Sequence, residues 1–377
     1  MAIDYNKTPW PWFGGKADAA EAVWGALGDV AHYVEPFAGS LAVLLRRPHV
    51  CNRAYYSETV NDLDGLLVNA WRSIQMSPEA TADAASWPVS EADLHARHVA
   101  LVRWREERQL EHLMGDPLFH DPVMAGWWMW GQSSWIGSGW CSGKGPWTAD
   151  ADGRLHKQTK EPGVHRKRTH LGDNGQGVNR PQAREEGVHR KRPHLGDNGQ
   201  GVNRPQAREE GVGDYHPMTM PELLRWMQFL SARLRHVRIL NGDWKRACTG
   251  GALKTIPVRS GQLAAGVFLD PPYSAEAGRA ELYSEEDWTV AHDVRQWCLE
   301  HGDDADLRIV LAGFDNEHTE LEQHGWRCVE WYRAGFLKGG MGNTASSGSQ
   351  TQQKRERLWL SPHCLRADDT PAQGLLL

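Results

Sequence analysis

The stretch of the sequence best suited to chemistry is VFLDPPYS, residues 267–274, where an apolar run ends at an acid, two prolines and an aromatic ring. Proline has no N–H for a sheet ladder and aspartate is costly to bury, so these residues make a poor core strand. Pro271 and Pro272 fix the backbone, because each ring locks φ. The stretch indicates either an ordinary strand end or a site in which the Asp270 carboxylate lies on a rigid backbone beside the ring of Tyr273.

Two more acidic segments follow predicted strands near the N-terminus. In EPFAGS, Glu35 ends one strand and leads into a glycine turn, which lets the backbone approach a ligand at the carboxyl end of a sheet. In ETVNDLD, Asp62 follows the next strand, where an acid can accept hydrogen bonds from ribose hydroxyls. A helix N-cap is the alternative role for Asp62. If the register differs, Asp64 or Glu58 could bind the ribose.

Four motifs together resemble one family. WFGGK, EPFAGS, ETVNDLD and DPPY occur in the order seen in the Dam-like (D12 class) DNA adenine N6-methyltransferases. The resemblance implies an α/β protein, from a phage or a bacterium, with a Rossmann-like S-adenosylmethionine-dependent methyltransferase fold and an inserted target-recognition region. Its implied activity is transfer of a methyl group to N6 of a flipped-out adenine in double-stranded DNA. One departure is Leu41, which stands where the family usually has its second glycine.

The resemblance also implies a catalytic motif made of Asp270, Pro271, Pro272 and Tyr273. The Asp270 carboxylate and the Pro271 carbonyl would accept hydrogen bonds from the amino group of adenine, and Tyr273 would stack on the flipped base. Catalysis of this kind is positioning plus electrostatics, so no metal is expected. An aspartate in the first position favours adenine N6 over cytosine N4.

The same resemblance assigns contacts to S-adenosylmethionine. Trp12 and Lys16 match the residues that hold the methionine end of the cofactor, Asp62 the ribose-binding acid, and Asp243 the acid that meets the adenine. The complete implied set is Trp12, Lys16, Glu35, Pro36, Phe37, Gly39, Asp62, Asp243 and Trp244.

Strand and helix patterns alternate in two zones, residues 1–80 and 230–365, which are predicted to form one discontinuous catalytic domain that binds S-adenosylmethionine. Apolar residues at helical spacing predict an amphipathic helix over 63–74. Residues 366–377 are expected to form a flexible tail. The predicted strands lie in HYVEPF, AYYSETVND, HVRILNGDW, GVFLDPPYS, LRIVLAGFD, WRCVEWY and RERLWLS.

Residues 81–229 interrupt this pattern and are interpreted as the target-recognition insertion. Part of it is a Trp-rich stretch, residues 126–147, in which interleaved Gly and Ser favour loops over a continuous helix. This stretch is either a patch of the core or a surface on which bases stack.

The insertion also contains a tandem repeat, residues 163–186 and 187–210, whose copies differ only at Thr169 and Pro193. Each copy is locally basic in a chain of net charge −6. The repeat is either a mobile low-complexity segment or an arm that orders on a phosphate backbone, in which case deletion of one copy should weaken DNA binding in a salt-dependent way. Its candidate DNA contacts are Arg166, Lys167, Arg168, Arg180, Arg190, Lys191, Arg192 and Arg204.

Composition limits the other possibilities. With 40% hydrophobic and 24% charged residues the chain resembles soluble globular proteins, and it has no run of about 20 apolar residues. The first residues lack the pattern of a signal peptide, so the cytoplasm is the expected location. The six cysteines lack metal-binding spacing. The alternatives left open are a methyltransferase acting on cytosine N4 or RNA, and an inactive DNA-binding or anti-restriction module of the same fold.

Overall fold

A computed structural model of the chain describes most of the two α/β zones and part of the segment between them. The described residues are 5–12, 14–48, 56–106, 110–135, 140–141, 147–149, 155–157, 220–253, 265–273, 290–331 and 355–366. The tandem repeat and its candidate DNA contacts lie outside these ranges, as does almost all of the predicted tail.

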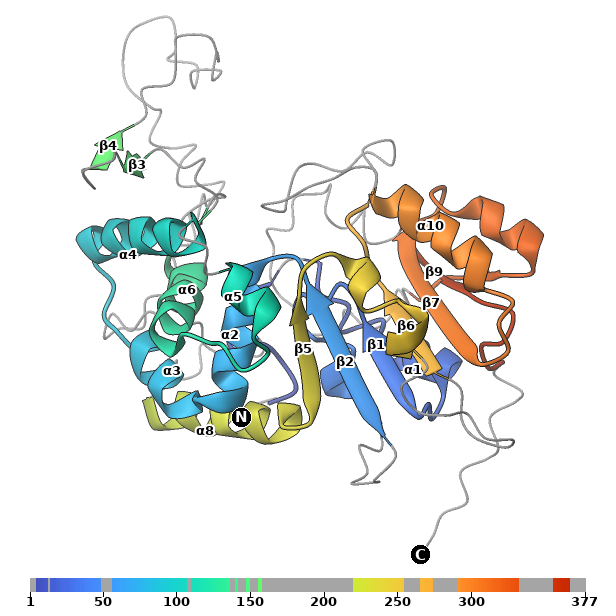
Figure 1. Ribbon diagram of the computed structural model, residues 1–377, viewed down its shortest axis with the longest axis horizontal. Coiled ribbons are helices and arrows are strands. Elements are labelled where there is room, and N and C mark those ends of the chain that lie inside the picture. The colour runs from blue at the N-terminus through green and yellow to red at the C-terminus, as the bar shows by residue number, and fades with distance from the viewer. Residues whose placement is uncertain are drawn as a thin grey trace, which may run out of the picture.

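A seven-stranded sheet runs through the centre of the described structure (Figure 1). Its first five strands in spatial order are mutually parallel, and β9 runs antiparallel to both of its neighbours. Side by side, the strands are β5 (Val237–Asn241), β2 (Ser57–Asp62), β1 (His32–Glu35), β6 (Ala265–Leu269), β7 (Leu307–Phe314), β9 (Glu356–Leu360) and β8 (Arg327–Val329). All seven predicted strands are therefore confirmed.

The strand order is compatible with a Rossmann-like, doubly wound fold. From β1 the chain adds β2 and β5 on one side, and then returns to add β6 and β7 on the other. The direction of winding thus reverses between β1 and β6, and in open α/β sheets ligands bind at such a reversal, beside the carboxyl ends of the strands.

Alternate residues of the central strands build two hydrophobic cores, one on each face of the sheet. In β6, Phe268 lies in one core, whereas Val267 and Leu269 lie in the other. In β7, Val310 lies in the same core as Phe268, and Ile309 lies in the same core as Val267. Because both faces are covered, these strands are continuous apolar runs instead of alternating ones.

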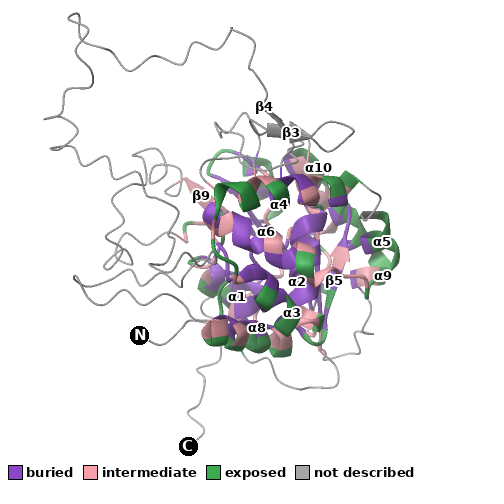
Figure 2. Cartoon of the chain, turned by 90° about the vertical axis from the view of Figure 1, so that its left-hand side faces the viewer, coloured by how far each residue is buried: buried purple, intermediate pink, exposed green. Residues whose placement is uncertain are grey.

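The first face is covered by helices that share a single core with the sheet. Seen from this side in Figure 2, α2 and α6 are largely buried, whereas α3 and α8 expose their outer surfaces. The helices on this face are α1 (Ala20–Leu27), η1 (Leu44–Arg46), α2 (Gly65–Met76), α3 (Pro78–Ala85), α4 (Glu91–Trp104), α5 (Leu110–Gly115), α6 (Pro122–Ser134) and α8 (Met220–Leu234). The helix predicted over 63–74 is confirmed as α2.

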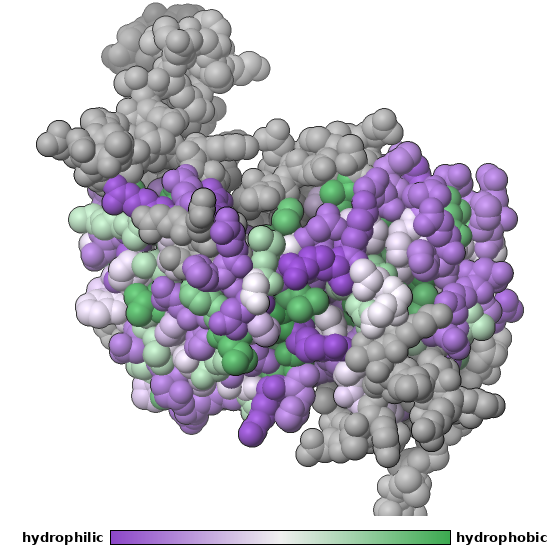
Figure 3. All heavy atoms as spheres, in the orientation of Figure 1, coloured by the Kyte–Doolittle hydropathy of each residue, from purple (hydrophilic) through white to green (hydrophobic). Residues whose placement is uncertain are grey.

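The second face is covered by helices from the C-terminal zone. These are η3 (Trp244–Arg246), α9 (Gly250–Leu253), α10 (Val290–His301) and η5 (Thr319–His324). A separate antiparallel pair, β3 (Trp147–Ala149) and β4 (Leu155–Lys157), lies in the segment between the zones. The side of the molecule that carries α10, at the right of Figure 3, is mostly hydrophilic.

The expectation of loops in the Trp-rich stretch is wrong for residues 126–134, which belong to helix α6. Asp121 caps this helix by accepting from two backbone N–H groups at 3.0 Å. Its glycines mark close packing and not flexibility, because a Cβ at Gly126 would lie 2.5 Å from the Cβ of Ala84. Trp128 and Trp130 are 2% and 0% exposed, so this part of the stretch is a core patch.

In its described part, the predicted insertion shares a hydrophobic core with the two α/β zones. Helices α3 to α6 pack into the same core as β1, β2 and β7, and the predicted boundary at residue 230 falls inside α8.

Within the described residues, no helix combines the length and apolar character needed to cross a membrane.

Candidate functional site

A cavity lies at the carboxyl ends of β1, β2, β5 and β6, where the sheet reverses its direction of winding. Its volume is about 160 Å³, roughly ten times the ~15 Å³ that a single water needs. All four motifs contribute to its lining. The predicted residues that line it are Trp12, Lys16, Glu35, Pro36, Phe37, Gly39, Asp62, Asp243, Trp244, Asp270 and Pro272.

The turn after β1 brings backbone to the cavity. Gly39 has a φ of 46°, and a Cβ there would lie 3.1 Å from the Nε1 atom of Trp12. Its N–H donates to Asp62 Oδ2 at 2.9 Å, and its carbonyl accepts from Trp71 Nε1 at 2.9 Å. Glycine is required here because both the left-handed φ and the approach of Trp12 disfavour a side chain.

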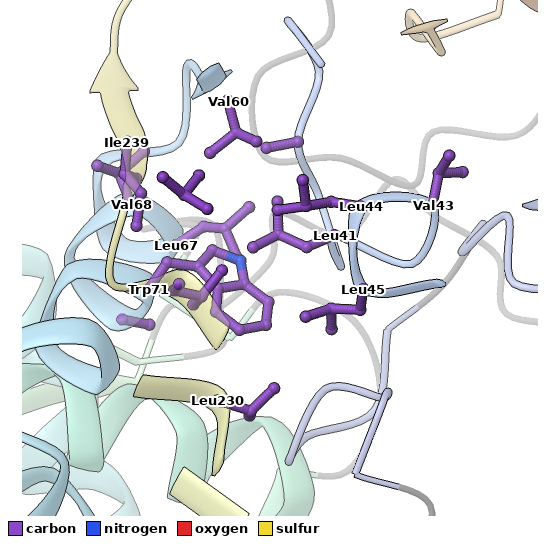
Figure 4. Packing of buried hydrophobic residues seen from close by; sticks show 14 of the residues in the cluster. Leu41, Val43, Leu44, Leu45, Val60, Leu67, Val68, Trp71, Leu230 and Ile239 are labelled. Carbon is purple, nitrogen blue, oxygen red and sulfur yellow. The ribbon is translucent and has the colours of Figure 1, made fainter. Parts of the chain in front are cut away.

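Leu41 adopts a φ of 54° in the same turn, although it is not glycine. A left-handed φ costs an L-residue roughly 1–2 kcal/mol. The side chain is fully buried, and Figure 4 shows it beside Leu44, across from Leu67 and Trp71 of α2. Burial of the leucine side chain therefore offsets the strain of its left-handed backbone.

Because burial of the Leu41 side chain offsets backbone strain, we expect an unusual order of stability for variants of Leu41. Leu41→Ala should lose about 3 kcal/mol of unfolding free energy, because it leaves a cavity and keeps the strain. Leu41→Gly should lose about 1 kcal/mol less, because it relieves the left-handed φ. Chemical denaturation measures both, and Leu44, buried in the same core without a positive φ, is the matched control. At position 44, the alanine variant should be more stable than the glycine variant. The same order at position 41 would show that the left-handed φ of Leu41 costs no stability.

The three acids of the second motif have separate positions. Asp62 Oδ1 accepts from the N–H of Asp64 at 3.0 Å, and Oδ2 accepts from Gly39, so Asp62 joins the turns after β2 and β1. Asp64 is the N-cap of α2. Glu58 lies at the opposite end of β2, where it pairs with Arg47 at 3.1 Å and Arg233 at 2.7 Å. Of the three acids, Asp62 is the one whose position suits a ribose. Partial burial raises the pKa of Asp62 to about 6.

Two asparagines hold the turns around the cavity together, and neither was predicted. Asn61 donates from Nδ2 to the carbonyls of Pro36 and Gly242, at 3.1 and 2.9 Å. Asn241, at the end of β5, donates to the carbonyls of Asp62 and Leu63. A polar residue at the carboxyl end of a parallel strand is the sequence signal that could have found both.

Glu35 ends β1 inside the cavity and is 3% exposed. Its Oε2 atom accepts from the hydroxyl of Tyr33 at 3.0 Å. Burial raises the pKa of Glu35 from its usual 4.5 to about 8, although the Tyr33 hydrogen bond opposes the shift, and the nearby charge of Asp270 adds to it. Near neutral pH this site therefore holds a proton that a cationic ligand group would displace.

The raised pKa of Glu35 predicts how stability depends on pH. The folded state keeps this proton up to about pH 8, whereas the unfolded chain releases it near 4.5, so the wild type loses stability as pH rises through this window. Glu35→Gln removes the effect. We expect its unfolding free energy relative to wild type to increase by roughly 2–4 kcal/mol between pH 5 and pH 8.5, as measured by urea denaturation. If the difference in unfolding free energy between Glu35→Gln and the wild type did not change with pH, the Glu35 carboxyl would not be protonated in the folded state.

The segment after β5 supplies an acid and an aromatic wall. Asp243 is exposed at the mouth of the cavity and caps η3 by accepting from Lys245 N at 2.8 Å. Trp244 is 5% exposed and its ring stacks on Phe37, with centroids 6.0 Å apart. Both rings line the cavity and offer an apolar surface to a planar ligand.

The DPPY motif and the lysine of WFGGK meet at the other end of the cavity. The Nζ atom of Lys16 lies 3.1 Å from Asp270 Oδ2, and the hydroxyl of Tyr273 donates to Asp270 Oδ1 at 3.2 Å. Lys16 also donates to the carbonyl of Gly14 at 3.1 Å and lies 3.7 Å from Glu356 Oε2. The ammonium expected to hold a cofactor carboxylate thus already pairs with the expected catalytic acid.

Tyr273 and Pro271 are buried and are not among the residues that line the cavity. The ring of Tyr273 packs edge-on against Phe314, with centroids 4.6 Å apart, and is 3% exposed. In this arrangement Tyr273 fixes Asp270, and stacking on a base requires its ring to become exposed. The stacking role remains a prediction.

The charges around the cavity are strongly biased. Five of its lining residues are acids, and one, Lys16, is a base. Among the described residues, no group of three or more His, Cys, Asp or Glu side chains is arranged to hold a metal ion. The acids are Glu35, Asp62, Asp64, Asp243 and Asp270.

Comparison of the chain with models of known protein families and with curated proteins produced no match.

Proposed function

We propose that this chain is an S-adenosylmethionine-dependent DNA methyltransferase that methylates N6 of a flipped-out adenine. The observation that carries the proposal is the acidic cavity at the reversal point of the sheet. Four motifs far apart in the sequence line this cavity, and they are the motifs on which the resemblance to the Dam-like family rests. A Rossmann-like sheet is also what that resemblance implies.

The charge of the cavity favours this cofactor over a dinucleotide. S-adenosylmethionine carries a sulfonium and an ammonium cation, which the ionised acids of the cavity attract, whereas the same carboxylates repel the pyrophosphate of a dinucleotide. In glycine-rich Rossmann sites the pyrophosphate instead lies at the N-terminus of a helix. Here the glycine turn after β1 leads only into the three-residue 3-10 helix η1, and the next helix, α2, begins at the carboxylate of Asp64, which would oppose an anion.

The residues present fit S-adenosylmethionine group by group. Asp62 would accept from the ribose hydroxyls, since each of its oxygens has a lone pair beyond its backbone hydrogen bond. Phe37 and Trp244 would hold the adenine, and Glu35 would bind the ammonium once it is ionised. When bound, the cofactor supplies an electrophilic methyl group: the sulfur keeps the bonding electron pair, and the methyl carbon bonds to the acceptor nitrogen.

The protein's part in the reaction is to hold and polarise the acceptor. The lone pair of an adenine amino group is delocalised into the ring, so the nitrogen becomes nucleophilic when both of its hydrogens are bound by acceptors. Asp270 would supply one acceptor and the Pro271 carbonyl the other. Lys16 and Tyr273 each bind one oxygen of Asp270, which fixes the carboxylate plane. Such a preorganised acceptor holds the amino group in the orientation needed for attack on the methyl carbon.

Incubation with methyl-labelled cofactor tests the proposal. We expect label in double-stranded DNA and, after digestion to nucleosides, in N6-methyladenine. Label in N4-methylcytosine or in RNA would assign the alternative substrates. Calorimetric binding of S-adenosylmethionine without any transfer would indicate an inactive module, and a folded protein that binds no cofactor would refute the assignment of the cavity.

A further inference from the structure

A third charge lies beside Asp270 and Lys16, on a strand that carries none of the four motifs. Glu356 is the first residue of β9, and its Oε2 atom lies 3.7 Å from Lys16 Nζ. The side chains of Lys16, Asp270 and Glu356 are only 6%, 18% and 15% exposed, so water and salt screen their charges weakly. Together they form a carboxylate–ammonium–carboxylate group.

The antiparallel direction of β9 explains why Glu356 is here. The parallel strands β6 and β7 end at the cavity edge of the sheet, and β9 begins there because it runs in the opposite direction. In the register of the sheet, Glu356 pairs with Phe314, the last residue of β7. The ring of Phe314 contacts Tyr273, which follows Asp270 in the DPPY motif. Glu356 is therefore placed at the proposed reaction centre by strand pairing.

The Asp270–Lys16 pair alone carries no net charge, and this is a poor environment for the reaction proposed above. In that reaction the amino nitrogen becomes cationic as the methyl carbon bonds to it, and it stays cationic until one of its protons passes to water. A neutral pair does little to stabilise this cation. The side chains of Lys16, Asp270 and Glu356 together carry one net negative charge, which favours the transition state over the uncharged amino group of the ground state.

We propose that Glu356 is a positioning residue of the methyl transfer: it takes a share of the Lys16 ammonium, so that Asp270 meets the acceptor amino group as a negatively charged partner. This inference rests on the function proposed above. At 3.7 Å, Glu356 acts on Lys16 mainly through its charge, and Asp270 at 3.1 Å remains the closer partner of the ammonium.

The test is a kinetic double-mutant cycle between positions 356 and 16 in the full chain, with S-adenosylmethionine and adenine-containing duplex DNA. Glu356→Gln should lower kcat by roughly 10- to 100-fold, with KM for DNA and Kd for the cofactor changed by less than about threefold, since the charge acts in the transition state. In the Lys16→Met background the same substitution should change kcat by less than about twofold, because Glu356 acts through the ammonium.

Two further variants separate this role from a structural one. Glu356→Asp keeps the charge and should restore kcat to within about fivefold of wild type. Glu330→Gln is the matched control. Glu330 pairs at 2.9 Å with Arg357, which follows Glu356 in β9, but its side chain is 72% exposed and lies outside the site. Its kcat should equal that of wild type. Thermal unfolding confirms that each variant is folded.

The outcomes distinguish the two proposals. Equal losses of kcat from Glu356→Gln in the wild-type and Lys16→Met backgrounds would overturn the positioning role while leaving the methyltransferase assignment intact. An unchanged kcat in Glu356→Gln would do the same. Absence of transfer by the folded wild-type protein would overturn the proposed function, and the role of Glu356 with it.

Discussion

Replacement of Asp270 by alanine is expected to lower the single-turnover rate of methyl transfer by about 100- to 1000-fold, the usual loss when one preorganised polar contact to a transition state is removed. The variant removes the proposed acceptor for an amino hydrogen and leaves the Lys16 ammonium facing the nitrogen that becomes cationic. Cofactor affinity should change less than about tenfold, because the residues proposed to hold the ribose and the adenine are Asp62, Phe37 and Trp244 and do not include Asp270.

The matched control for this experiment is Asp83→Ala, which removes an exposed carboxylate from α3 on the surface of the helical layer. It should transfer methyl groups at the wild-type rate. Transfer by Asp270→Ala within tenfold of wild type would mean that the DPPY motif is not the reaction centre.

Replacement of Asp62 by asparagine is expected to raise the Kd for S-adenosylmethionine by about 10- to 100-fold, because a hydrogen bond to a charged group contributes about 1.5–3 kcal/mol. The amide also presents an N–H₂ toward the N–H of Gly39 or Asp64, where the carboxylate has only acceptors. Since the pKa of Asp62 is about 6, wild-type affinity should rise as pH increases through 6, and the affinity of the variant should lack this rise.

Asp64, two residues further along the chain, provides the control for Asp62. Its carboxylate accepts from Leu66 N and Leu67 N at the start of α2, so Asp64→Ala should lose about 1 kcal/mol of unfolding free energy and little cofactor affinity. Calorimetric titration and denaturation of both variants give the comparison. If Asp64→Ala lost the affinity and Asp62→Asn kept it, the ribose-binding role would belong to Asp64.

The sheet could be predicted because its strands are short and nearly continuous apolar runs between turn residues. β6 and β7 have this form because both of their faces are buried. The polar residues at the strand ends, Glu35, Asp62 and Asp270, indicated a site because parallel strands bring their carboxyl ends to one edge. The strand ends alone therefore predicted which residues line the cavity at this edge.

The helical layer was harder to predict because glycine has two opposite uses. In α6, Gly126 and Gly131 suggested loops, yet each is needed because another segment passes too close for a side chain. A Cβ at Gly131 would collide with the ring of Trp140. Tertiary packing of this kind has no local signature in one sequence, and so the tryptophans of α6 could not be assigned to the core from composition.

Glu356 was beyond prediction for a similar reason. It lies 86 positions after Asp270, in a strand without any motif, and reaches the site only through the antiparallel pairing of β9 with β7. The departure at Leu41 is different: the sequence identified the missing glycine, but the compensating burial of the leucine side chain became visible only in the fold.

Whether this chain methylates adenine in DNA is decided by the mass of the product. Duplex DNA is incubated with the protein and S-adenosylmethionine carrying a trideuterated methyl group, then digested to nucleosides and analysed by mass spectrometry. We expect N6-trideuteromethyl-deoxyadenosine with wild-type protein and almost none with Asp270→Ala. Unmodified deoxyadenosine after incubation with folded, cofactor-binding wild-type protein, over a broad set of DNA sequences, would contradict the proposed function.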